Sequence, residues 1–184
     1  MKLDNAKYSF SEEEIKLVKD FSIKINTTYY SNRNQFDNDK RTTDQIVGKL
    51  AEIAIFNLLK DKVKSITYPD FTIYSNDRKS WLSDLKAGKI NIHSKAQSLE
   101  QSKIFGLSWI FQINDKHIFS QFTDNDYVIF VVIDLVKYDA EIKSIAQVSS
   151  LHDEKLFKDP KIKSLVGNKK AIYFDDLKKL NMTL

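Results

Sequence analysis

The feature that most constrains the fold is a continuous apolar run, YVIFVVIDLV, at residues 127–136. The run consists of β-branched and aromatic side chains, which favour strands, and it lacks the apolar–polar alternation of a half-exposed strand. A strand of this kind is buried on both faces, as strands in the middle of a mixed sheet are. We therefore predict an α/β (α+β) fold whose core is a mixed sheet with this strand near its centre.

Length and composition fit one globular domain. The 184 residues are 42% hydrophobic, and only 4 Gly and 2 Pro are present, which excludes a linker-rich or low-complexity chain. The absence of Cys excludes disulfides, thiolate nucleophiles and Cys-ligated zinc. We expect a single domain over 1–184, with an N-terminal helix and arm at 1–40, a core that carries the candidate site at 41–150 and a closing segment at 151–184.

Location and charge constrain the function only weakly. No run approaches the ~20 apolar residues of a membrane span, and the first 16 residues lack the apolar centre of a signal peptide, so we expect a cytoplasmic protein. The formal net charge of +4 permits a polyanionic partner without requiring one. Function must therefore be sought in particular residues.

Two helices are predicted in the first third of the chain. Each begins at a pair of residues with the spacing of a capping box, Ser11 with Glu14 and Thr42 with Gln45. Apolar residues cover nearly every side of the second helix, which predicts that it is largely buried. The helices are expected over residues 12–26 and 44–60, with an ordered loop or arm over 26–40 between them.

Short strands are predicted after residue 64, where helical periodicity gives way to β-branched and aromatic segments. Besides the apolar run at 127–136, the expected strands cover residues 71–74, 81–85, 89–97, 108–112 and 141–148, and short helical turns at 161–165 and 175–180 close the domain. Trp81 and Trp109 are expected to fill the core rather than to stack on bases.

The expected strand at 89–97 carries the most informative polar pattern. Strict alternation gives it one apolar face and one face of functional residue types. Asp84 ends the preceding strand, and Lys86-Ala87-Gly88 can turn the chain back, so Asp84 can lie beside the functional face across a hairpin. The apolar face has Ile90, Ile92, Ser94 and Ala96, and the functional face has Asn91, His93, Lys95 and Gln97. A solvated strand face is the plain alternative explanation.

Glu52 is the third element of the candidate site. It is the only acid between Gln45 and Lys60, and it lies in the middle of the helix that is predicted to be buried. A buried carboxylate needs a partner, which is either Lys49 or Arg41 in a structural pair, or a metal ion.

These residues resemble the PD-(D/E)xK nuclease superfamily, the fold of most type II restriction endonucleases. There, a helix glutamate is followed by an acid on one hairpin strand and by acid-x-Lys on the next. The resemblance covers residues 48–97 and maps Glu52 to the helix acid, Asp84 to the first strand acid, His93 to the second acid and Lys95 to the lysine. It implies a restriction endonuclease-like mixed sheet flanked by helices.

Two departures from the family pattern concern the acids. The second acid is replaced by His93, which suits Mn²⁺ better than Mg²⁺. A literal Pro-Asp occurs at Pro69-Asp70, so Asp70 is the alternative strand acid. We prefer Asp84, because the hairpin brings it opposite Lys95.

The chemistry that the resemblance implies is metal-dependent phosphodiester hydrolysis. Glu52 and Asp84, with a strand carbonyl and His93, are expected to hold Mg²⁺, or Mn²⁺ in its place, which activates a water molecule. Lys95 orients or deprotonates that water and stabilises the developing charge, and His93 is an alternative base.

The expected substrate is double-stranded DNA, cut at a specific site by a homodimer, as in a type II restriction endonuclease. Two alternatives stay open: a non-catalytic nucleic-acid-binding domain in which His93 marks a decayed site, and a DNase toxin or repair nuclease of the same fold. Candidate contacts to the nucleic acid are Gln97, Lys40 and Arg41.

Overall fold

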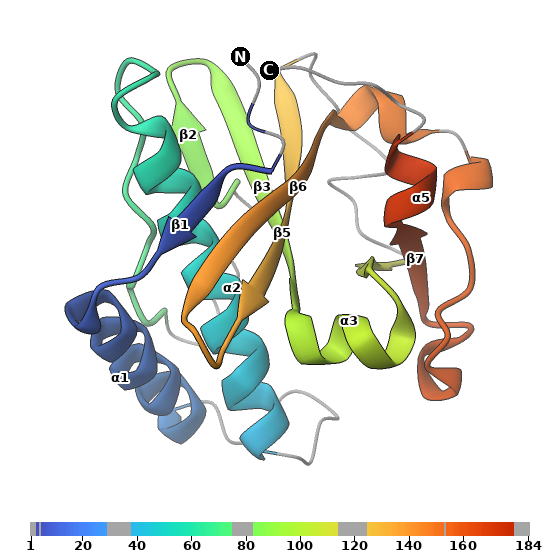
Figure 1. Cartoon of the computed structure of the whole chain (residues 1–184), viewed down its shortest axis with the longest axis horizontal. Coiled ribbons are helices and arrows are strands. Elements are labelled where there is room, and N and C mark those ends of the chain that lie inside the picture. Colours follow the sequence, from blue (N-terminus) through green and yellow to red (C-terminus); the bar gives the residue numbers. More distant parts are fainter. Residues whose placement is uncertain are drawn as a thin grey trace.

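A curled mixed β-sheet flanked by helices forms most of the molecule, and a two-stranded sheet packs beside it (Figure 1). The computed structural model describes residue 3 and residues 5–28, 38–74, 83–113, 125–152 and 154–178. The predicted mixture of helices with a mixed sheet is confirmed. Within the described ranges, no helix combines the length and apolar character needed to cross a membrane.

The larger sheet has five strands, and the apolar run lies at its centre. β5 pairs in parallel with β3 on one side and antiparallel with β6 on the other, so the sheet is mixed as predicted. β5 ends two residues before the predicted boundary, and Asp134 accepts two backbone N–H groups of the turn that follows. The strands, in spatial order, are β1 (Lys7–Ser9), β6 (Asp139–Gln147), β5 (Asp126–Asp134), β3 (Ile90–Ser98) and β2 (Leu85–Ala87).

The first helix begins where the sequence predicts. α1 (Glu12–Thr28) starts after Ser11, whose Oγ accepts the backbone N–H of Glu14 (3.2 Å), and the Glu14 carboxylate accepts that of Ser11 (2.9 Å). This reciprocal pair is a capping box.

The start of the second helix was predicted wrongly. α2 (Asn38–Leu59) already includes Thr42 and Gln45, so their capping-box spacing does not mark its first turn. Inside the helix, the Thr43 hydroxyl donates to the carbonyl of Asp39 one turn earlier (2.9 Å). The expected loop over 26–40 contributes its first residues to α1 and its last three to α2, and its middle lies outside the described residues.

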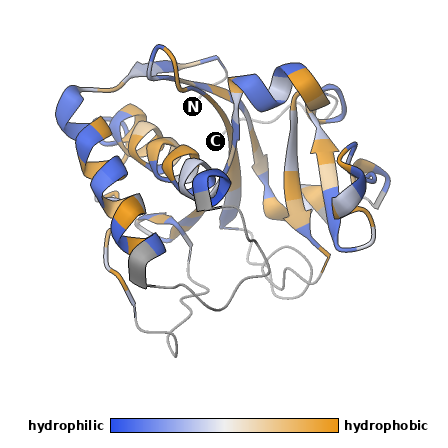
Figure 2. Ribbon diagram, turned by 90° about the horizontal axis from the view of Figure 1, so that it is seen from below, coloured by the Kyte–Doolittle hydropathy of each residue, from blue (hydrophilic) through white to orange (hydrophobic). Residues whose placement is uncertain are grey.

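Two hydrophobic cores lie on opposite faces of β5, because its side chains alternate between the faces. The first core is enclosed between the sheet and α2, with α1 on the outside, and Figure 2 shows apolar residues gathered on α2. The second core lies between the sheet and the β4–β7 pair. β5 gives Ile129, Val131 and Ile133 to the first core and Val128, Phe130 and Val132 to the second.

A short hairpin joins β2 to β3. Leu85 pairs with Ile92 and Ala87 with Ile90, so Gly88 and Lys89 form the loop, and Gly88 has the positive φ of +61° that such loops favour. The predicted turn at Lys86-Ala87-Gly88 therefore begins two residues too early and shares only Gly88 with the observed loop. The strand expected over 81–85 is wrong for Ser83 and Asp84, which precede β2, and residues 81–82, including Trp81, lie outside the described part of the chain.

Other predicted strands had mixed outcomes. β4 (Ser108–Gln112) has the predicted bounds, whereas residues 71–74 are not a strand. In the described segment between α2 and β2, Ile66 forms an isolated bridge with Ala87. Trp109 of β4 is buried in the second core, as predicted, and donates its indole N–H to the Val131 carbonyl (3.1 Å).

Two strands, one α-helix and two 3₁₀ helices of the described chain were not predicted from the sequence. The strands and the α-helix are β1, α3 (Leu99–Phe105), which lies between β3 and β4, and β7 (Lys169–Tyr173), which pairs antiparallel with β4. Short 3₁₀ helices are η1 (Val148–His152), η2 (Glu154–Leu156) and η3 (Lys163–Leu165), and α5 (Phe174–Leu177) ends the described chain.

Candidate functional site

The edge of the large sheet is open beside the second half of β3. β2 is only three residues long and pairs with β3 as far as Ile92, and no other described strand continues on that side. Asp84, just before β2, bends inward, and its Oδ2 accepts the backbone N–H of Ser94 (2.7 Å). A carboxylate therefore takes the place that a neighbouring strand would occupy.

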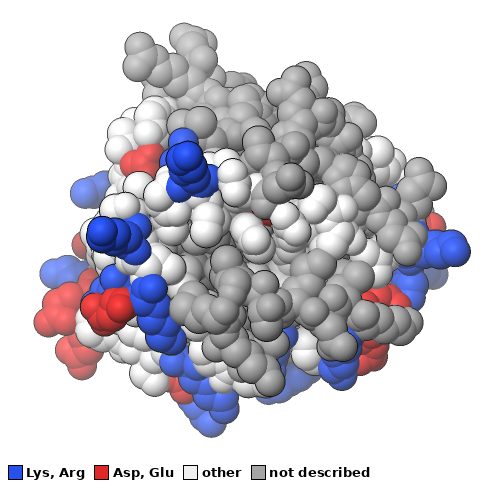
Figure 3. Space-filling model, turned by 90° about the horizontal axis from the view of Figure 1, so that it is seen from above, with Lys and Arg blue, Asp and Glu red and all other residues white. Residues whose placement is uncertain are grey.

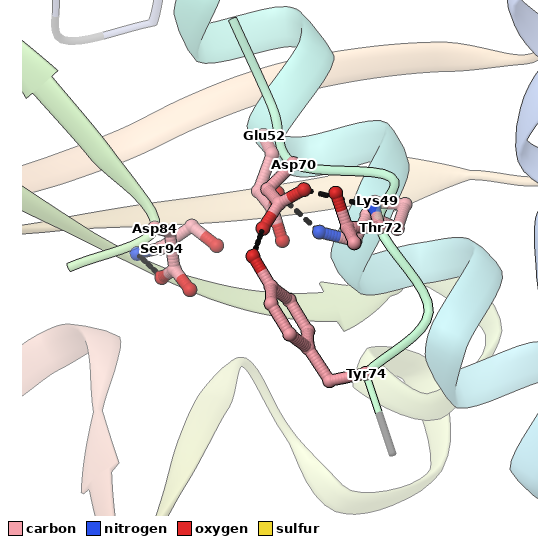
Figure 4. Close-up of polar contacts among 7 residues, drawn as sticks. All are labelled: Lys49, Glu52, Asp70, Thr72, Tyr74, Asp84 and Ser94. Atoms are coloured by element: carbon pink, nitrogen blue, oxygen red, sulfur yellow. Dashed lines mark hydrogen bonds and ion pairs between the residues drawn. The ribbon is translucent and has the colours of Figure 1, made fainter. Parts of the chain in front are cut away.

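Three acidic side chains gather at this open edge (Figure 4). Glu52 comes from α2, Asp70 from the segment after α2, and Asp84 from the start of the hairpin. We call these three residues the acidic cluster. They come from segments well separated in the sequence, and the charges of Asp70 and Asp84 both act on the Glu52 carboxyl group. The two acids that the sequence offered as alternatives are thus both neighbours of Glu52.

The Glu52 carboxyl group is the most buried of the three. Glu52 is 7% exposed, and burial raises its pKa to about 8. Lys49 opposes this shift by its charge and its hydrogen bond, whereas the negative charges of Asp84 and Asp70 add to it. Burial and the two neighbouring aspartates both disfavour the ionised form of Glu52. A cation bound beside the cluster would stabilise that ionised form.

Asp70 is exposed and is oriented by its own segment. Burial acts to raise its pKa, but hydrogen bonds from Thr72 and Tyr74, together with the charge of Lys49, outweigh burial and hold the pKa below its usual value. The Thr72 backbone N–H donates to Oδ1 (2.8 Å), and the Tyr74 hydroxyl donates to Oδ2. Asp70 is therefore an oriented, negatively charged group beside the buried Glu52.

Lys49 is the cation in contact with the acidic cluster. Its Nζ lies 2.7 Å from Oε2 of Glu52, and the two side chains are 19% and 9% exposed. Sequence analysis offered Lys49 or Arg41 as a structural partner of Glu52, and the structure places Lys49 there.

His93 and Lys95 lie on the other face of β3. Ile90, Ile92 and Ala96 pack with the first core, beneath α2, as the alternation predicts. The Lys95 Nζ lies 4.7 Å from the centre of the Phe111 ring, on the side of the second core. The hairpin does bring Asp84 next to His93 in register, but Glu52 approaches the edge from one face of the sheet and Lys95 from the other.

His93 faces a partner that the sequence analysis did not consider. Its Nε2 lies 3.4 Å from Oδ1 of Asp126, the first residue of β5, and the two side chains are 19% and 12% exposed. This contact orients the imidazole toward β5. The expected role of His93 as a metal ligand beside Glu52 therefore has no support in this geometry.

No family model, curated protein or solved structure matches this chain. The assignment of the site therefore depends on the geometry and the residue types alone.

A literal acid-x-Lys sequence that the sequence-based prediction did not use runs into the first strand of the hairpin: Asp84-Leu85-Lys86 follows Pro69-Asp70 by 14 residues. Lys86 is exposed, and its backbone is held by Thr67, which accepts the Lys86 N–H and donates its own N–H to the Lys86 carbonyl, both at 2.8 Å. A literal search for the two motifs would have found this pair, because both are present as written.

The three candidate contacts to nucleic acid have different surroundings. The Gln97 side chain, from β3, fixes the turn between α3 and β4. Its Nε2 donates to the Gly106 carbonyl (3.1 Å), and its Oε1 accepts the Ser108 N–H (3.0 Å). Lys40 is exposed and Arg41 half-buried in the first turn of α2, about 16 Å along the helix axis from Glu52. Gln97 therefore has a structural role, and the other two lie far from the acidic cluster.

Charged side chains on one face of the molecule are mixed in sign. In Figure 3, Lys and Arg lie mostly toward the rim, interspersed with Asp and Glu, and most of the described residues near the middle are white, that is, uncharged. The net charge of +4 is not gathered into one basic patch on the part of this face that is described.

The donor chemistry of the cluster fits a hard divalent cation. Carboxylate oxygens are the ligands that Mg²⁺ and Mn²⁺ accept, and Mg²⁺ is commonly held by one or two carboxylates together with water and substrate phosphate. Among the described residues, the acidic cluster included, no three His, Asp or Glu side chains lie close enough together to hold a metal ion by themselves. The fit is therefore to a loosely held, water-rich ion, not to a closed structural metal site.

Proposed function

We propose that this protein is a divalent-metal-dependent nuclease, and that the acidic cluster at the open edge of β3 is its active site. The observation that carries the proposal is the meeting of Glu52, Asp70 and Asp84, which come from three separate segments. Like-charged groups repel, and Lys49 offsets only part of this repulsion, so a bound cation would stabilise the cluster with all three carboxylates ionised. Hydrolysis of a phosphodiester is chemistry that such a cation supports.

The order of the elements supports a restriction endonuclease-like arrangement. The buried helix α2 carries the glutamate, the β2–β3 hairpin follows, and after α3 and β4 the chain returns as β5, which is parallel to β3. A glutamate-bearing helix followed by a hairpin, within a mixed central sheet, is what the resemblance to the PD-(D/E)xK superfamily implies, with the catalytic acids at the hairpin. The proposal of this fold family rests on that order together with the acidic cluster.

Within the site, Glu52 and Asp84 are the residues that hold Mg²⁺ or Mn²⁺, and Asp70 adds negative charge beside them. The bound ion supplies an activated water molecule and neutralises charge on the phosphate. Lys95 orients or deprotonates the attacking water. Because Lys95 lies on the opposite face of β3, at the same edge, its ammonium group must turn from Phe111 toward Asp84 to do so. His93 keeps its place beside Asp126 and is not needed as a ligand.

The proposed substrate is double-stranded DNA, and the proposed active form is a cytoplasmic homodimer of the type II restriction kind. One active site per chain cuts one strand, so two copies related by two-fold symmetry would cut both strands of a duplex.

The experiment is plasmid cleavage by the purified protein in EDTA, in Mg²⁺ and in Mn²⁺. We expect cleavage only with added metal, and discrete fragments if the protein recognises a specific site. Asp134→Asn is the matched control for Asp84→Asn, because Asp134 also accepts backbone N–H groups, in the β5–β6 turn.

The alternative functions give different results in the same assay. Cleavage that persists in EDTA would exclude the metal mechanism. A smear instead of discrete fragments would favour a toxin-like or repair nuclease, and tight DNA binding without cleavage in either metal would favour the non-catalytic binding domain.

A further inference from the structure

Lys49 presents a fixed ammonium group to the acidic cluster. Besides its 2.7 Å contact with Glu52, its Nζ lies 5.6 Å from the ring centres of both Phe21 and Phe71. The two rings meet edge to face, with centres 5.0 Å apart. Cation–π contacts of this kind hold an ammonium group in place and limit its contact with water.

The charge of Lys49 acts on more than its direct partner. It lowers the pKa of Glu52 and that of Asp70, so the ammonium group lies within electrostatic reach of two members of the cluster. Its exposed fraction of 19% leaves part of the side chain open to a ligand. Lys49 therefore places a positive charge beside the acidic cluster.

We propose that Lys49 is a catalytic residue of this site, whose ammonium group contacts the scissile phosphate and neutralises the charge that develops on it. The inference rests on the proposed nuclease function and adds a residue to it. A phosphate oxygen brought to the cluster enters the same partly buried space as Nζ. A preorganised cation in such a space stabilises a transition state more than a solvated one does.

A purely structural role would make a different prediction. If Lys49 only kept Glu52 ionised, its loss would leave the carboxyl group protonated and lower the affinity of the site for the metal. Excess metal would then restore the cleavage rate. If Lys49 acts on the phosphate, saturating metal cannot replace it. The dependence of the rate on Mn²⁺ concentration therefore separates the two roles.

The experiment compares Lys49→Met with Lys60→Met, the matched control. Lys60 lies on the turn after the same helix, donates to a side chain three residues earlier (Asn57, 2.8 Å) and lies 6.0 Å from the Phe56 ring, but it is exposed and is not in contact with the acidic cluster. Single-turnover plasmid cleavage is measured across a Mn²⁺ titration. Mn²⁺ binding is measured separately, without DNA, from the loss of the free-ion EPR signal.

We expect the maximum rate of Lys49→Met at saturating Mn²⁺ to fall ~10²-fold, with Mn²⁺ affinity within about threefold of wild type. Lys60→Met should cleave and bind Mn²⁺ like wild type. Lys49→Arg keeps the charge and pairs with Glu52, yet we expect it to lose about tenfold or more in rate, because its planar group places the charge differently.

Four outcomes would overturn the inference. Wild-type cleavage by Lys49→Met, or full recovery of its rate in excess Mn²⁺, would leave the proposed function standing but remove Lys49 from the reaction. If Lys49→Met does not fold, a wild-type rate for Lys49→Arg would have the same meaning. A wild-type protein that cuts nothing in Mg²⁺ or Mn²⁺ would overturn the proposed function and this inference with it.

Discussion

The Glu52 carboxyl group shows how one side chain can couple stability to pH. Burial raises its pKa from 4.5 to about 8, whereas in the unfolded chain the group is in water. Between these two values the folded protein holds a proton that the unfolded chain has released. The free energy of unfolding should therefore fall as pH rises through this window, at up to ~1.4 kcal/mol per pH unit from this group alone.

Glu52→Gln should remove this pH dependence. Glutamine cannot ionise, so the stability of the variant relative to wild type should increase from about pH 5 to pH 8 and change little above that. Urea unfolding in EDTA at several pH values measures the difference, and Glu13→Gln, on the exposed side of α1, controls for the amide itself. Parallel pH profiles for wild type and Glu52→Gln would contradict the assigned shift.

The two aspartates of the cluster should both be needed for cleavage. Sequence reasoning treated Asp84 and Asp70 as alternatives for one position, but both charges act on Glu52. We expect Asp84→Asn and Asp70→Asn each to reduce the single-turnover rate ~10²-fold or more while the protein stays folded, and Asp134→Asn to have little effect. Retention of wild-type activity by Asp70→Asn would leave Asp84 as the strand acid of the site.

Two glycines show how the backbone of an element decides the effect of the same substitution. Gly48 lies inside α2, where an added Cβ meets nothing within 4 Å, whereas Gly88 has a φ of +61° in the β2–β3 loop. Alanine stabilises a helix interior more than glycine does, but an alanine backbone is strained at positive φ.

Gly48→Ala should therefore stabilise the fold by about 0.5–1 kcal/mol, and Gly88→Ala should destabilise it by about 1–2 kcal/mol. Each variant serves as the other's control, since both add one methyl group without a clash. Chemical denaturation measures both. Equal effects of the same sign would contradict the backbone geometry assigned to the hairpin and to α2.

At the scale of the whole molecule, β5 joins the two cores. Ile129 faces the first core and Phe130 the second, and both are fully buried. Since one strand contributes to both, the cores should unfold together rather than as separate units.

We therefore expect Ile129→Ala and Phe130→Ala to lower one common unfolding transition, by ~2–5 and ~3–5 kcal/mol. Far-UV circular dichroism follows α1 and α2 beside the first core, and fluorescence follows Trp109 in the second, with Trp81→Phe removing the other tryptophan. Coincident urea curves are expected. Two separate midpoints would show that the β4–β7 part unfolds on its own.

Local patterns in the sequence were sufficient for the elements whose signals need no distant partner. The run at 127–136 predicted a central, doubly buried strand because unbroken hydrophobicity leaves no solvent-facing side. Ser11 and Glu14 marked the start of α1 because a capping box is satisfied within four residues. The alternation after Lys89 separated the apolar face of β3 from its polar face for the same kind of reason.

Only the tertiary structure decided which functional side chains meet. Sequence spacing along β3 grouped His93 and Lys95 with Asp84, but the side of the sheet that α2 covers is set by packing, and this places Glu52 on the opposite face. Asp70 reaches Glu52 for the same reason, whereas Lys49, three residues before Glu52 on α2, is a local neighbour that the sequence already offered. β1 and β7 exist as strands only because β6 and β4 pair with them. Pairing and burial depend on residues far apart in the chain, so no local pattern contains them.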